Sequence, residues 1–309
     1  MILSIIQMAL PVIVTFLLGA FCRQKKIFSP EGLAGIRALV SNVLLPVVLF
    51  NAFFTAEYSA KIALTFGTVF GACALGLLLG FLLRRLAEPH GKFMPFLVTN
   101  FEGGMLGYAL YGLLYPGQTA TFAMADIGQT LSAHTVFLVA LVAVSGGQSS
   151  PVAALKRAIR TPALIGSLLG VLLGALGVGR AVLGSAAGAI VTDLIGFITA
   201  PTSALILIIV GYDLSLRREL MRPVAITCAL RLAVMALMLG LSCAVIFHVI
   251  PFEKPLFTAL LLAYSLPAPF IVPLYADVTG HGEYISTTLS VQTILSIVLF
   301  IGIAAYSLI

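Results

Sequence analysis

Long apolar stretches alternate along the chain with short groups of charged, glycine and proline residues. A helix needs about 20 mostly apolar residues to cross the hydrocarbon core of a bilayer. The pattern predicts ten such helices, at about 2–22, 33–55, 60–83, 93–115, 119–145, 162–178, 184–212, 223–247, 255–276 and 283–309. We expect the first stretch to be retained as a helix, because it lacks the basic start and small-residue cleavage site of a secretory signal. The sequence therefore predicts an all-α integral membrane protein.

Composition supports this interpretation. Apolar residues make up 61% of the 309 residues and charged residues 9%, against roughly 45–50% and 25% in an average soluble domain. The connections between the predicted helices leave no room for a folded soluble domain. The cysteines, Cys22, Cys73, Cys228 and Cys243, lie in or at the ends of predicted helices without metal-ligand spacing, so we expect packing roles and no cofactor or metal.

Basic residues gather on one side of the predicted bundle. Twelve of the 17 follow the first, third, fifth and seventh helices: Arg23, Lys25, Lys26, Arg84, Arg85, Lys92, Lys156, Arg157, Arg160, Arg217, Arg218 and Arg222. Arg37 and Arg231, in the first turns of the second and eighth helices, belong to the same side, and the opposite side holds Lys61, Arg180 and Lys254. By the positive-inside rule the basic loops are cytoplasmic, which puts both termini of a cell-membrane protein outside. No motif for nucleic acid accompanies these charges, so we expect contacts with lipid headgroups.

Matching features recur in the two halves of the chain. Pro46 and Pro201 are 155 residues apart, and the dipeptides starting at Gln129 and Gln292 are 163 apart. The most irregular predicted spans, 93–115 and 255–276, align at an offset of 165. We expect a five-helix repeat at 1–145 and a second at 162–309, inverted because five is odd. The alternative is ten helices with scattered glycine and proline, which membrane helices often contain.

The two irregular spans predict broken helices. One carries Gly103, Gly104 and Gly107, and the other carries Pro267, Pro269 and Pro273. Proline removes a backbone donor and glycine weakens a helix, and unpaired backbone is tolerated in a membrane only where it is buried or lines a cavity. The N-termini of half-helices favour anions, and unwound carbonyls favour cations. Alternatively, the breaks only shape helix packing.

Polar side chains near these breaks are candidate functional residues, because ionisable groups at membrane depth are costly. Glu102 precedes the glycine pair and Asn100 lies two residues earlier, while Asp126, Gln129 and Thr130 share one face of the fifth helix. The two carboxyl groups are candidates for carrying protons. Alternatively, they coordinate Na⁺ together with Asn100, Gln129 and backbone oxygens. Asp126 is either buried or in an external vestibule.

Several segments resemble the auxin efflux carrier family in its bacterial form: FLLGAFCRQKKIFSPEG, SNVLLPVVLFN, LILIIVGYDLS and FIVPLYADVTGHGEYISTTLSVQTILSIVLF. The likeness runs over nearly the whole chain. It implies inverted repeats related to the fold of bile acid–sodium symporters, with the fourth and ninth helices crossing at their breaks. It also implies a scaffold at 2–55 and 162–212, a moving transport domain at 60–145 and 223–309, and cargo such as malonate or malate.

From the breaks and the resemblance together we expect two groups of site residues. The substrate-binding group is Asn100, Gly103, Gly104, Ser265, Pro267 and Pro269, and the ion-coupling group is Glu102, Asp126 and Gln129. The sequence departs from the family pattern in having Glu-Gly-Gly at 102–104 instead of a proline, and in lacking an acidic residue near Ser265–Pro269. The second departure weakens Na⁺ coupling and leaves proton coupling or uniport open.

The sequence thus predicts a secondary transporter of small organic anions, not an enzyme. A Na⁺-dependent symporter of the bile acid type is the alternative within transport. A membrane-embedded enzyme or a receptor is the alternative of another class, although HExxH, GxSxG and P-loop patterns are missing from the sequence. The spacing Gly166–Gly170–Gly174 suits close helix packing, and the glycine-rich scaffold helices permit a homodimer.

Overall fold

The structure, a computed structural model, describes residues 2–56, 58–145, 152–153, 156, 159–275 and 278–308, and every regular element in these ranges is helical. Arg157, counted among the basic residues, lies outside the described residues. Within these ranges, seven helical segments are long and apolar enough to span a membrane: Leu3–Gln24, Pro30–Phe54, Ala60–Ala87, Thr119–Ser145, Gly188–Tyr212, Arg218–Val249 and Gly282–Ser307. The all-α class is therefore confirmed. The count of ten stays a prediction, because the other three expected spans are short or interrupted.

The first half of the chain contains α1 (Ile2–Gln24), α2 (Pro30–Leu39), η1 (Val40–Leu44), α3 (Leu45–Phe54), α4 (Ala60–Leu83), η2 (Arg84–Ala87), α5 (Met94–Val98), η3 (Gly103–Gly107), α6 (Tyr108–Leu114), α7 (Thr119–Ser132), η4 (Ala133–Phe137) and α8 (Leu138–Ser145). The second contains α10 (Pro162–Ala175), α11 (Val178–Leu183), α12 (Gly188–Thr199), α13 (Thr202–Tyr212), η5 (Arg218–Leu220), α14 (Met221–Val249), α15 (Lys254–Ser265), α16 (Val272–Tyr275) and α17 (Gly282–Ser307). The span Gly188–Tyr212, which the sequence predicted from residue 184, is interrupted by a turn at Pro201 between α12 and α13.

The second predicted helix is formed by α2, η1 and α3 without a gap. Ser29 caps it by accepting a hydrogen bond from the Gly32 amide over 3.1 Å, and Pro30 occupies the first turn, where its missing N–H costs nothing. Pro46 is the second residue after the π-helical turn η1. A π turn accommodates a residue that cannot donate the regular helical hydrogen bond, so this helix continues past its proline.

Glycines allow close contact between helices from the two halves of the chain. A Cβ at Gly166 or Gly170 of α10 would lie 2.6 Å from a carbonyl oxygen of α3, that of Pro46 or Phe50. Likewise α1 packs closely on α13. The Gly166–Gly170–Gly174 stripe is therefore used within the chain, and a homodimer would have to use another face.

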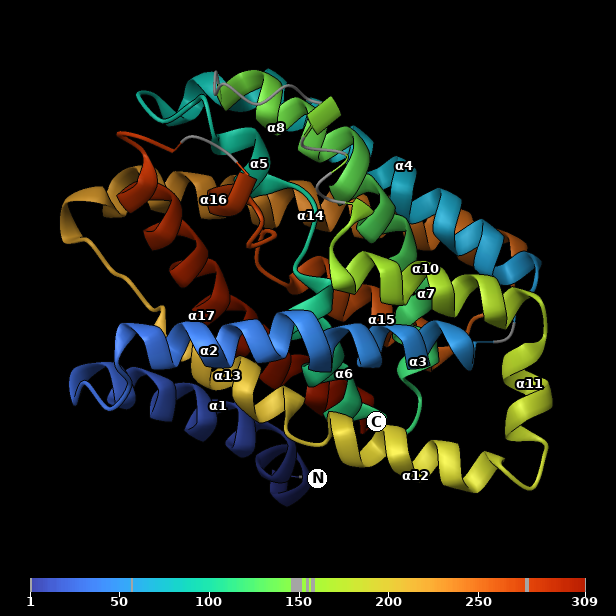
Figure 1. The fold of residues 1–309 in the computed structure, drawn as a ribbon. Coiled ribbons are helices and arrows are strands. Elements are labelled where there is room, and N and C mark those ends of the chain that lie inside the picture. Colours follow the sequence, from blue (N-terminus) through green and yellow to red (C-terminus); the bar gives the residue numbers. More distant parts are fainter. Residues whose placement is uncertain are drawn as a thin grey trace.

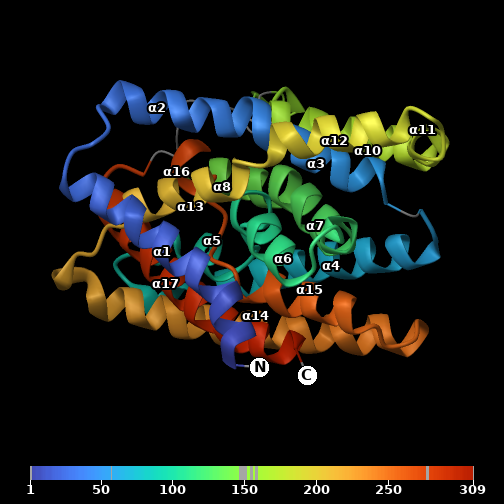
Figure 2. The same ribbon diagram turned by 90° about the horizontal axis from the view of Figure 1, so that it is seen from below.

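Two groups of helices follow from the packing. The first group consists of α1, α2, α3, α10, α12 and α13, in which α1 and α2 pack on α13 and α10 and α12 pack on α3. The second consists of α4, α5, α7, α14, α15 and α17, in which α4 packs on α7 and α14 packs on α4, α5, α15 and α17. The contacts of α1 with α17 and of α3 with α7 join the two groups. Figure 2 shows α2, α3, α10 and α12 along one face and α14 and α15 toward the opposite face, with the short elements α5 and α6 between. The broken segments therefore lie inside the molecule.

The outer surface is apolar. Phe197 is 85% exposed and Leu82 is 70% exposed. Large apolar side chains exposed over a whole surface are unfavourable in water and favourable in contact with lipid tails. This surface fits a protein that crosses a membrane several times.

Charged and polar contacts join residues at the two ends of the bundle. At the end that carries the basic loops, the basic end, Arg37 forms an ion pair with Asp213 and Arg23 donates to the Leu214 carbonyl. Arg217 lies 2.8 Å from Glu283 at the same end. At the other end Lys61 pairs with Glu253, and Lys254 donates to the Ser307 carbonyl. In Figure 1 the α1–α2 turn and the α13–α14 connection lie at the left and α11 at the right, and the two termini lie close together in both views.

Candidate functional site

The first break separates α5 from η3. After Val98 the chain is extended at Thr99 and then adopts a left-handed conformation at Asn100, with φ of 51°. Asparagine tolerates this conformation better than most residues with a side chain. Asn100 is 1% exposed, and its side-chain amide lies 3.4 Å from the Ser132 hydroxyl. The break is therefore fully inside the protein, as the residue types of the sequence predicted.

The second break separates α15 from α16. The helix ends at Ser265, Leu266 is extended, and Pro267 and Pro269 prevent the helix from continuing. Both prolines are buried, while Ser265 is partly exposed and its carbonyl accepts a hydrogen bond from Ser296 over 2.6 Å. The α16 helix then begins at Val272.

The two breaks are in direct contact. The Glu102 amide donates to the Pro267 carbonyl over 2.9 Å, and the Phe270 amide donates to Glu102 Oε2 over 2.8 Å. Glu102 is 9% exposed, so both bonds form in a region of low dielectric constant. One glutamate of the first half thus supplies a donor and an acceptor to the second break, which itself has no acidic side chain near it in sequence.

Two glutamines perform matching tasks at the two breaks. Gln129 of α7 donates through Nε2 to the Phe101 carbonyl. Gln292 of α17 accepts from the Ala268 amide over 2.9 Å and donates to the Leu97 carbonyl over 2.8 Å. Gln129 was a predicted site residue, whereas Gln292 was noticed only as its partner in the repeat. Their bonds satisfy backbone groups that a continuous helix would have paired.

Arg231 also contacts both breaks, and its predicted position was wrong. The sequence placed it at the basic end, but it lies ten residues into α14 and is 4% exposed. Its guanidinium donates to the carbonyls of Leu97, Thr99, Asn100 and Leu266 at 2.6–3.3 Å. A count of charges by position in the sequence missed it, although its depth in a predicted helix already marked it as a costly, functional type of residue.

Asp126 is completely buried, which excludes the external vestibule for its side chain. Thr130 donates to its Oδ2 over 3.2 Å, while Oδ1 and the nearby Tyr108 hydroxyl make no hydrogen bond of ordinary geometry with the described residues. Gly103 packs directly on this carboxyl, since a Cβ there would overlap Oδ1 and lie 2.8 Å from Cγ. Gly104 has more room, because its nearest neighbour would be Leu45 at 3.7 Å. Gly103 therefore joins the first break to Asp126.

A cleft of about 460 Å³ reaches the second break from the basic end. One wall contains Arg37 and Asp213, from the group of helices around α1, and the other contains Ser290 and Thr293 of α17. Phe270 lies at the break itself and also lines the cleft. A small polar molecule entering between the two helix groups would thus meet the second break at Phe270 and Pro273, whereas none of the predicted site residues lines this cleft.

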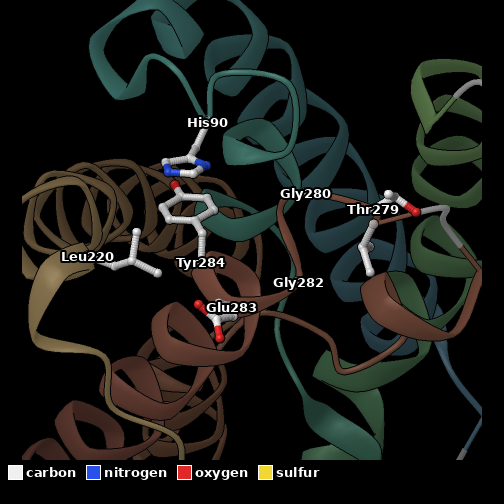
Figure 3. A pocket seen from close by; sticks show the side chains of 8 residues that line it. His90, Leu220, Thr279, Gly280, Gly282, Glu283 and Tyr284 are labelled. Atoms are coloured by element: carbon white, nitrogen blue, oxygen red, sulfur yellow. The ribbon is translucent and has the colours of Figure 1, made fainter.

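A second hollow of about 640 Å³ lies at the basic end and contains none of the predicted site residues. Figure 3 shows the His90 ring against the ring of Tyr284, with a centroid distance of 4.2 Å and an angle of 9°. His90 Nδ1 also lies 3.1 Å from Nδ1 of His281. Burial and the neighbouring His281 lower the pKa of His90.

Comparison with known proteins agrees with this description. The family model described as "Membrane transport protein" matches residues 4–144 and 148–303. An "Uncharacterized transporter" of Methanothermobacter thermautotrophicus is 26% identical over 302 residues, which cover 94% of this chain and 95% of the relative. The residues matched by the family model include both breaks.

Proposed function

Because the chain belongs to the membrane transport protein family, that of the auxin efflux carriers, we propose that it is a secondary carrier of small organic anions that works by alternating access. Its cargo is a mono- or dicarboxylate such as malonate or malate. The observation that supports this proposal most strongly is the contact between two interrupted helices, one from each half of the chain. A cleft between the two helix groups lies beside this contact. The family resemblance and the positive ends of half-helices support the choice of an anion.

The chain has ten spans in two inverted five-helix repeats, 1–145 and 162–309. Contacts with matching roles support this proposal: α1 packs on α13 and α10 packs on α3, so the first helix of each half packs on the second helix of the other. The third and fifth helices also pack together in each half, as α4 with α7 and as α14 with α17. Gln129 and Gln292 serve the two breaks in corresponding ways.

The scaffold comprises 2–55 and 162–212, and the transport domain comprises 60–145 and 223–309. The two contact groups of helices support this division. Ion pairs join residues of predicted cytoplasmic loops with one another, and residues of predicted external loops with one another. The protein lies in the inner or plasma membrane with both termini outside, as the close termini and the positive-inside rule support.

The anion binds at the crossed breaks, in contact with Asn100, Gly103, Gly104, Ser265, Pro267 and Pro269. The coupling ion is a proton, carried by Glu102, with Asp126 and Gln129 beside it. Glu102 and Asp126 are both buried, and an anion arriving near two carboxylates is less repelled when one of them is protonated. Proton uptake and anion uptake are therefore linked by charge.

Na⁺ coupling is the second candidate, and one observation favours it. The sequence of the second break lacks an acid, but the Glu102 carboxylate lies there, within 2.8 Å of the Phe270 amide. A carboxylate beside unwound carbonyls is a common way to hold Na⁺ in broken-helix transporters. The two candidates differ in the gradient that drives uptake.

Purified protein in liposomes tests the proposal and separates the candidates. We expect labelled malonate or malate to accumulate when a pH gradient is imposed without Na⁺, and to stop doing so when an uncoupler removes the gradient. Uptake that depends on a Na⁺ gradient and not on the pH gradient would show that the coupling ion is Na⁺ and not a proton. Failure of every tested mono- and dicarboxylate either to enter liposomes or to raise the unfolding temperature of the protein would contradict the proposed cargo class.

A further inference from the structure

One guanidinium group joins the two breaks to a third helix. Arg231 of α14 donates to Leu97, Thr99 and Asn100 at the first break and to Leu266 at the second. We infer that Arg231 is the positioning residue of the crossover, the contact between the two breaks. It holds the two breaks in a fixed relative position and connects them to α14. This inference rests on the proposed function, in that the crossed breaks are taken as the substrate site.

The geometry uses the whole donor capacity of the side chain. Arginine has five N–H donors in a planar fork, and the five donations of Arg231 go to carbonyl oxygens at 2.6–3.3 Å. These carbonyls lie at the ends of α5 and α15, where no following helical turn pairs with them. Lysine has a single donor group and cannot span acceptors of two segments in the same way.

The guanidinium of Arg231 has backbone carbonyls as its partners and no contacting carboxylate. None of the ion pairs among the described residues includes it. Burying a cation is costly, and hydrogen bonds to its donors reduce that cost; here backbone carbonyls accept from Nε, Nη1 and Nη2. Displacing either break from α14 would leave part of the guanidinium without partners, so the two breaks and α14 are held as one unit.

This unit extends to the rest of its helix group. The helix α14 packs against α4, α5, α15 and α17. A movement of α14 therefore moves both breaks together and keeps their mutual geometry. Without the arginine fork, the breaks would keep the Glu102–Pro267 and Glu102–Phe270 bonds and the packing of α5 and α15 on α14, but would lose their hydrogen bonds to α14.

The test compares Arg231→Lys and Arg231→Gln with Ser242→Ala. Ser242 is buried on the same helix, and its hydroxyl lies 2.7 Å from that of Tyr264 near the end of α15. The variant Ser242→Ala thus removes a buried α14–α15 hydrogen bond and keeps all five hydrogen bonds between Arg231 and the break carbonyls. Hydrogen–deuterium exchange of purified protein is followed in peptides covering 97–107 and 262–272, and counterflow of labelled malonate is measured in liposomes.

Both arginine variants are expected to exchange about tenfold faster in both peptides, the change that the loss of one charge-assisted hydrogen bond causes. Ser242→Ala keeps the arginine bonds, so exchange in both peptides is expected to rise by less than in the arginine variants. In counterflow the arginine variants raise KM about tenfold with a smaller change in the maximal rate, whereas Ser242→Ala keeps the KM of the original protein.

Unchanged exchange at the breaks in a folded Arg231 variant would overturn the inference, as would an equal increase in Ser242→Ala. Loss of the fold in both arginine variants but not in Ser242→Ala would make Arg231 a residue of the whole fold and would also overturn it. If the original protein shows no malonate counterflow, the proposed cargo fails, while the exchange result still decides the role of Arg231.

Discussion

The Glu102 amide donates to the Pro267 carbonyl over 2.9 Å, across 165 residues of sequence. The same glutamate accepts from the Phe270 amide through its carboxylate. Backbone and side chain of one residue thus hold the second break against the first. Changes at this glutamate or its glycine neighbours are therefore expected to act on both halves of the molecule.

Gly103 and Gly104 provide a matched pair of variants. In Gly103→Ala the added Cβ overlaps the Asp126 carboxyl, whereas in Gly104→Ala it meets Leu45 at an ordinary distance of 3.7 Å. We expect Gly103→Ala to lower the free energy of unfolding by about 1–3 kcal/mol, typical of overpacking in a core, and Gly104→Ala to have little effect. Thermal unfolding in detergent measures both, and equal unfolding temperatures would contradict the contact between Gly103 and Asp126.

Glu102→Gln separates charge from geometry. The glutamine carbonyl still accepts from the Phe270 amide, so the crossover keeps its shape while its ionisable group is lost. We expect uptake of labelled malonate to lose its dependence on an imposed pH gradient. Glu283→Gln, at the exposed pair with Arg217, serves as the control and keeps this dependence. Unaltered pH-dependent uptake in Glu102→Gln would remove this residue from the coupling mechanism.

Asn100 combines a backbone role with a side-chain role. Its φ of 51° costs alanine about 1–2 kcal/mol and costs glycine little. We therefore expect Asn100→Ala to unfold at a lower temperature than Asn100→Gly, while both lose malonate binding because the amide is gone. Binding is measured as the shift in unfolding temperature on adding malonate. Normal binding by Asn100→Gly would show that the side chain does not contact the substrate.

The histidine at the basic end predicts how stability depends on pH. Burial and His281 lower the pKa of His90 below its ordinary 6.5, against an opposing effect of Glu88. The unfolded chain therefore binds this proton more readily than the folded protein does. Neutral His90 thus contributes fully to the free energy of unfolding above pH 6.5, and this contribution is lost as the pH decreases below 6.5. His90→Phe keeps a ring against Tyr284 and removes the titration. We expect its unfolding temperature to change less between pH 7.5 and 5.5 than that of the original protein, and an unchanged slope would contradict this assignment.

Much of this site follows from residue types in the sequence. Gly103, Pro267 and Pro269 predict breaks because glycine and proline act locally on the backbone, and Gln129 and Gln292 mark corresponding helices because they recur at a fixed offset. The roles of the two glutamines became clear only with the structure, since a hydrogen bond depends on the distance between helices.

The position of Arg231 was not predictable by the rule applied to it. Charge patterning assigns arginines to loops, and this rule holds for Arg23 and Arg217 at the basic end. Arg231 differs because carbonyls at the ends of two other helices accept hydrogen bonds from its guanidinium. That arrangement is a tertiary effect, and neither composition nor periodicity contains it. The contact of Gly103 with Asp126 was hidden for the same reason.

Counterflow tests the central claim, that this protein is a carrier of small organic anions, most directly. Liposomes containing the purified protein are loaded with unlabelled malonate and diluted into a trace of labelled malonate, without any ion gradient. A carrier that alternates between two sides transiently concentrates the label inside. We expect this overshoot, with competition by malate and none by an uncharged diamide. Equilibration without an overshoot, or no entry of label in excess of empty liposomes, would contradict it.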